Sequence, residues 1–171
     1  MSLFAAQSLS LDELLTALDH WVRWGWLRSL DRALVRWQLR QQPDTPAIVL
    51  LLTAFASHQV GRGHVCLDLQ ALLRHAGVTL ALPPERQRLS TEHQALLPER
   101  LLAQSLGTHD LQQYALTSLP LLAAQLRDYS GILQMAETRL YLRRYFDSEQ
   151  RVAAAIRARL QTILPDASDA T

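Results

Sequence analysis

The sequence contains no lysine, because all 17 of its basic residues are arginines. A phosphate-binding P-loop needs a lysine on the β- and γ-phosphates of a nucleotide, and this chain cannot supply one. Covalent catalysis through a lysine Schiff base is excluded for the same reason. The net charge of +1 is also too small to attract nucleic acid or a membrane through a strong field of the whole chain.

Cysteine and long apolar runs are scarce as well. Cys66 is the single cysteine, so no internal disulfide can form, which fits a reducing compartment. The longest apolar stretch, over 47–56, is too short to span a bilayer. A chain of 171 residues that is 49% hydrophobic can nevertheless bury a real core. We therefore expect a cytoplasmic protein that does not enter a membrane.

Helical periodicity dominates the first part of the chain. Ser10 and Glu13 form a capping box that begins a helix ending near Trp24. A second helix is predicted over about 29–41, and its apolar spacing indicates a core-facing side. The residues of that predicted core face are Leu27, Leu30, Leu34 and Trp37.

Two further helices are predicted around a short extended segment. The helix over 47–58 is apolar nearly all round, so we expect it at the centre of the domain. Asp68 is expected to cap a helix over 69–75, which Gly77 ends. Residues 80–92 have little periodicity and are expected to form a surface loop.

The period changes towards the end of the chain. Residues 98–105 and 110–128 have helical composition, whereas 132–135 and 139–142 resemble the two strands of a β-hairpin. Asp147 with Gln150 is expected to cap a last helix that Pro165 ends. The predicted fold is therefore mainly α, a compact helical domain with a small β-hairpin near the C-terminal helix.

One histidine and cysteine group is the only candidate for a metal site. Its members are His58, His64, Cys66 and His75. Their spacing matches no familiar zinc pattern, so we interpret the region as a structural loop and assign no metal ligands. We expect Gly61 and Gly63 to supply positive φ angles for a sharp reversal rather than to cradle a phosphate.

Tryptophan and arginine gather in the first quarter of the chain. Trp21, Trp24 and Trp26 cannot all face one side of a helix, so we expect at least one to be exposed. Arginines four residues apart form a stripe opposite the predicted core face: Arg28, Arg32, Arg36 and Arg40. Because Trp and Arg often anchor interfaces, these seven residues are the candidate partner-binding surface, with an inert solvated face as the alternative for the stripe.

A second basic cluster lies on or just after the predicted hairpin. Its members are Arg139, Arg143 and Arg144. A basic hairpin beside helices favours a small DNA-binding module as the alternative function, although a half-buried strand packed on the last helix fits equally. No catalytic arrangement of side chains stands out, so no catalytic residue is assigned.

Two motifs resemble the N-terminal region of RecD-like proteins. The first is Gly-x-Gly-His-Val-Cys-Leu over 61–67, which follows the apolar helix. The second is Arg-Leu-Tyr-Leu over 139–142, followed by a helix. The resemblance covers 47–73 and 132–156, and the intervening 78–129 matches poorly.

The resemblance implies an N-terminal domain over 1–165 with a frayed tail over 166–171. In RecD-like proteins the superfamily 1 helicase folds follow this region, so the ATP and magnesium sites would lie in motor domains absent from this chain. The parent would be the exodeoxyribonuclease V alpha chain, with ATP-dependent 5′–3′ helicase activity in DNA repair and recombination. The domain itself would bind no cofactor, would dock onto RecC beside RecB, and would touch DNA only weakly or indirectly.

Overall fold

The fold is built around α3 (Ala47–Gly61), the apolar helix that the sequence places at the centre. The computed structural model describes residues 9–106, 121–125 and 138–163. Every residue of α3 from Ile48 to Gln59 is buried, because other elements cover it on all sides. Phe55 stacks on the indole of Trp21 with 5.8 Å between ring centroids. The predicted central position of this helix is confirmed.

Helix α1 (Leu11–Arg23) begins at the predicted capping box. The Glu13 backbone N–H donates to the Ser10 hydroxyl at 3.2 Å, and the Glu13 carboxylate accepts from the Ser10 backbone N–H at 2.8 Å. The buried side of the helix is apolar and faces the core, as its periodicity indicates. That side consists of Leu14, Ala17, Leu18 and Trp21.

Helix α2 (Ser29–Gln41) packs against α3 with a different face from the one predicted, although Leu27, just before the helix, is buried as predicted. Its buried residues are Asp31, Val35 and Gln38, whereas Leu30 is 64% exposed and Trp37 is 39% exposed. The reason lies on α3, where Ser57 donates to Asp31 at 2.7 Å and Thr53 donates to Gln38 at 2.6 Å. These two hydroxyls of α3 thus hold the polar side of α2 inward.

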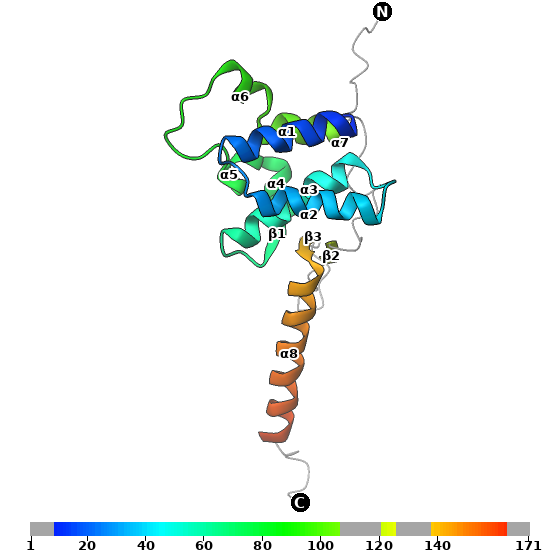
Figure 1. The fold of residues 1–171 in the computed structure, drawn as a ribbon. Coiled ribbons are helices and arrows are strands. Elements are labelled where there is room, and N and C mark those ends of the chain that lie inside the picture. The colour runs from blue at the N-terminus through cyan, green and yellow to red at the C-terminus, as the bar shows by residue number, and fades with distance from the viewer. Residues whose placement is uncertain (1–8, 107–120, 126–137, 164–171) are drawn as a thin grey trace, which may run out of the picture.

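A three-stranded antiparallel sheet lies between the helical body and the last helix (Figure 1). Its order is β1 (Cys66–Asp68), β3 (Thr138–Leu142) and β2 (Leu121–Gln125). The predicted strand over 139–142 is confirmed, and the hairpin lies beside the C-terminal helix as expected. Its partner is 121–125, so the helix predicted over 110–128 is wrong in that part. The other predicted strand, over 132–135, lies outside the described residues.

Short helices complete the body: α4 (Leu69–Arg74), α5 (Ala76–Leu80), α6 (Thr91–Ala95) and α7 (Pro98–Leu106). Asp68 caps α4 as predicted, accepting from the Ala71 backbone N–H at 2.8 Å. The predicted end at residue 75 is met within one residue, since α4 ends at Arg74, but Gly77 lies within α5 and does not end the helical region. The predicted fold class, mainly α with a small hairpin, is confirmed.

Helix α8 (Arg143–Ile163) projects away from the body as a single long rod (Figure 1). It begins directly after β3, four residues before the cap predicted at Asp147, because the chain passes from strand to helix without a loop. The tail over 166–171 lies outside the described residues. In the described ranges, no helix combines the length and apolarity needed to cross a membrane.

The buried carboxylate of Asp31 yields the first prediction. Asp31→Ala should lower the free energy of unfolding by about 2–3 kcal/mol, because the Ser57 hydroxyl loses its buried acceptor and Arg28 loses its ion pair. Arg28 is 44% exposed and can regain water, which keeps the loss below that of a fully buried pair. Urea unfolding measures it. Asp44→Ala, at an exposed loop aspartate, is the control and should stay within about 0.5 kcal/mol. An equally small effect at Asp31 would contradict the prediction.

Candidate interaction surface

Two of the three candidate tryptophans are core residues. Trp21 is fully buried, and its indole N–H donates to the Leu96 carbonyl at 2.8 Å. Trp26 is 1% exposed and donates to the Gln87 side chain at 2.5 Å. Each indole therefore links the region of α1 to the segment before α7 by a hydrogen bond. Because both side chains are buried, neither is available at the surface to contact a partner.

Trp24 is the candidate tryptophan that reaches the surface. It is half-buried at the end of α1 and packs edge-on against Trp26 at 5.1 Å between ring centroids. The ring centroid of His93 lies 4.2 Å from that of Trp24, and the ring centroid of His20 lies 5.3 Å from it. The expectation that at least one of the three is exposed is met only partly, because this aromatic cluster covers much of the ring.

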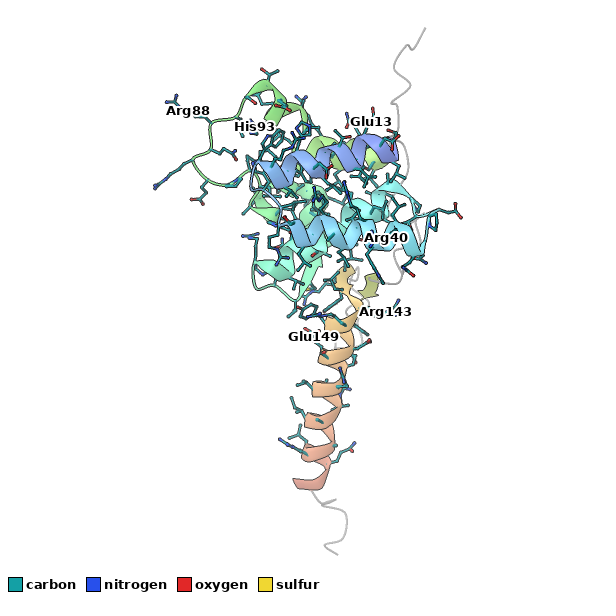
Figure 2. All side chains as sticks on the ribbon, in the orientation of Figure 1. Glu13, Arg40, Arg88, His93, Arg143 and Glu149 are labelled. Atoms are coloured by element: carbon teal, nitrogen blue, oxygen red, sulfur yellow. The ribbon has the colours of Figure 1, made fainter. Side chains whose placement is uncertain are left out.

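The arginine stripe is divided by ion pairs within the chain. Arg28 donates to Asp31 at 2.6 Å and to the Ser57 carbonyl at 2.6 Å. Arg32 and Arg36 both donate to Asp19 of α1, at 2.9 Å and 3.2 Å. Arg40 lies at the surface near the end of α2 (Figure 2). Three of the four guanidinium groups thus hold helices together, which lowers the charge that they offer to a partner.

Beside the arginine stripe, α2 carries an exposed apolar strip whose residues were predicted to face the core. Leu30, half-buried Leu34 and Trp37 follow one another at helical spacing on the outward side of α2. The signal that could have revealed it is the pair Thr53 and Ser57, spaced by four in an apolar helix. Such a pair marks a polar contact line, and the polar positions Asp31 and Gln38 of α2 match it.

The glycine loop after α3 is structural. Gly63 has a φ of +90°, as predicted, and so occupies a region that favours glycine. Gly61 does not have a positive φ, because it is the last residue of α3. A Cβ at Gly61 would meet the guanidinium of Arg28, so a larger residue here would displace that side chain from Asp31 and Ser57. The Arg28 guanidinium thus lies against the first glycine of this loop.

The histidine and cysteine group is not assembled into a site. His58 is buried and donates its Nε2–H to the Leu80 carbonyl at 3.0 Å, whereas His64 and His75 are exposed. Burial raises the pKa of the Cys66 thiol, which disfavours the thiolate that a metal needs. Within the part of the chain that the structure describes, no three His, Cys, Asp or Glu side chains are placed to hold a metal ion.

The hairpin arginines belong to different environments. Arg139 is half-buried in the central strand, paired in register with Asp68 of β1. Arg143 and Arg144 begin α8, and Arg143 lies at the base of that helix (Figure 2). The Arg144 guanidinium lies 4.8 Å from the ring centroid of Tyr145. The structure therefore does not present the three as one cationic tip, because β3 is sandwiched between two strands.

Helix α8 carries a second exposed apolar strip. Val152, Ile156 and Leu160 are each more than half exposed. Near the base of the helix, Val65 and Tyr145 join Val152 and Ile156 in lining a shallow hollow of about 390 Å³. These apolar side chains of α8 therefore lie at the surface of the described structure.

Comparison with known families identifies most of the body. The family model described as RecBCD enzyme subunit RecD, N-terminal domain, matches residues 23–141, well over half of the chain. The match includes 78–129, which the two sequence motifs leave out, and it ends before α8. No curated protein matches the chain.

The buried His58 generates a pH prediction. Burial lowers the pKa of His58 below its ordinary value of 6.5, outweighing the opposing effect of the Leu80 carbonyl. The unfolded chain therefore takes up this proton first, and the free energy of unfolding should fall as the pH drops from 6.5 towards the lowered pKa. His58→Gln, whose amide can still donate to Leu80, should flatten this dependence between about pH 5.5 and about pH 7.5.

Urea unfolding across that pH range measures the difference between the two chains. The matched control is His64→Gln, because it makes the same substitution at an exposed histidine in the loop after α3. Identical pH profiles for wild type and His58→Gln would contradict the assignment of a buried neutral imidazole.

Proposed function

This chain belongs to the family of RecBCD enzyme subunit RecD N-terminal domains, and from that membership we propose that it is a non-catalytic interaction domain that docks the subunit onto RecC. The observation that carries the proposal is the match over 23–141. The role lies within a helicase-nuclease that processes DNA ends for recombinational repair in the cytoplasm. ATP and magnesium would serve the motor domains of the subunit, with no cofactor in this domain.

The described side chains support an interaction role. The two motifs that resemble the family serve the fold, since Gly61 makes room for Arg28 and Leu140 of the second motif is fully buried. The hydrophobic residues left exposed lie mainly on helices, including α2 and α8. Contiguous apolar helix faces on a protein surface are typical of contacts with another protein.

The alternative, a DNA-binding module, would use Arg139, Arg143 and Arg144. The exposed Arg144 near the sheet favours it. Against it, Arg139 is half-buried in the central strand opposite Asp68, where a phosphate would compete with a carboxylate. Direct readout or strong backbone contact would also need more positive charge than this chain carries.

Binding to purified RecC tests the proposal. The wild-type chain should bind RecC with measurable affinity in isothermal titration calorimetry, because an interaction domain without catalytic chemistry acts through its surface. Binding to duplex DNA with an end should be weak and should fall steeply with salt. A chain that binds DNA tightly and RecC not at all would reject docking in favour of the alternative.

The control is a triple variant, Arg139→Gln, Arg143→Gln and Arg144→Gln. It should retain RecC affinity within about threefold once circular dichroism shows that it is folded, since side chains outside an interface change affinity little. A large loss of RecC affinity in this variant would move the docking surface to the hairpin.

A further inference from the structure

The outward face of α2 combines three features that point to a partner. It is apolar along a line, since Leu30, Leu34 and Trp37 lie at the spacing of i, i+4 and i+7. It is open, with Leu30 64% and Trp37 39% exposed. It is held rigidly, because Asp31 and Gln38 on the other side are bonded to Ser57 and Thr53 of α3. Rotation to bury the strip would break those contacts.

One margin of this strip is cationic. Arg36 and Arg40 are exposed, and at 100° per residue they lie side by side next to Trp37. Asp19 partly neutralises Arg36, while Arg40 has no ion pair among the described residues. The other margin of the strip turns into the buried contact with α3. A partner that complements this face must therefore bring apolar side chains flanked on one side by carboxylates.

Other occupants fit this pattern less well. A nucleic-acid backbone would pair with the arginines but would leave Leu30 and Trp37 without apolar contact. A second copy packed antiparallel about a two-fold axis would place its own Arg36 and Arg40 along the same edge, where like charges repel. An amphipathic helix with an acidic margin satisfies both parts of the face, and helix-in-groove contacts use this spacing of anchors.

We propose that the outward face of α2 is the docking site for an amphipathic helix of RecC with an acidic margin, an inference that rests on the proposed docking function. Apolar residues of that helix pack along Leu30, Leu34 and Trp37, and its Asp or Glu side chains pair with Arg36 and Arg40. The face from Leu30 to Arg40 is about 15 Å long at a rise of about 1.5 Å per residue, so it takes about three turns of a partner helix.

The test is a variant of the full chain that carries Leu30→Ala and Trp37→Ala, titrated with purified RecC. The expected result is a loss of affinity of at least about tenfold, since an exposed Trp and Leu become central anchors on binding. Thermal unfolding should change little, because neither side chain belongs to the core. The matched control, Val152→Ala with Ile156→Ala, changes residues of similar exposure on α8 and should bind RecC within about twofold of wild type.

A second variant, Arg40→Glu, tests the charged margin alone. It should weaken RecC binding by about three- to tenfold and flatten the salt dependence of the affinity. Since Arg40 makes no ion pair within the described residues, this change should not disturb folding. Binding of Arg40→Glu to RecC therefore still tests the α2 site if the double variant fails to fold.

The outcomes separate this inference from the function on which it rests. Wild-type binding to RecC with undiminished binding of both α2 variants would overturn the α2 site while docking stands. Failure of wild type to bind RecC would reject the docking function itself. Three other outcomes would also overturn the inference. Loss of RecC binding in the α8 control alone would place the RecC site on α8. Self-association that the double variant abolishes would assign the α2 face to a second copy of the chain, and DNA binding that only Arg40→Glu abolishes would assign it to nucleic acid.

Discussion

The buried polar contact between α2 and α3 determines which face of α2 is exposed at the surface of this domain. Two hydroxyls of α3, on Ser57 and Thr53, donate to the side chains of Asp31 and Gln38. Leaving any one of these groups buried without a partner would cost about 1–3 kcal/mol. Turning α2 to bury its leucines would incur this cost several times, so the helix keeps its polar side inward and its apolar strip in solvent.

Arg28 extends the same contact to the end of α3. Its guanidinium bridges the Asp31 carboxylate and the Ser57 carbonyl, and it lies where a side chain at Gly61 would be. A cation near the C-terminus of a helix is also favoured by the helix dipole. The glycine motif that resembles the family is therefore tied to packing. Its residue types report how α2, α3 and β1 fit together.

This division between interior and surface fits an interaction domain. The tryptophans that look like interface anchors in the sequence, Trp21 and Trp26, hydrogen-bond to the segment before α7 and stabilise the body. The surface instead offers the apolar strips of α2 and α8, each on a helix and each continuous over about two turns. A rigid body that presents helix faces suits a domain whose family belongs to a multisubunit enzyme.

Local patterns were sufficient for the elements whose causes are local. The capping box at Ser10 and Glu13, the cap at Asp68, the central apolar α3 and the strand over 139–142 were predictable because each depends on neighbours within a few residues. The family resemblance was also predictable, since its two motifs are short and contiguous.

The sequence alone thus determined a mainly helical domain of this family, with one central apolar helix and no lysine-based chemistry. Only the tertiary structure decided which face of α2 is buried, which tryptophans are core, and that β3 pairs with 121–125. The physical reason is that helical periodicity reports two faces but not their partners. Which face packs inward depends on Ser57 and Thr53, which lie 26 and 15 residues away from Asp31 and Gln38. Strand pairing likewise depends on hydrogen-bond register between segments distant in the chain.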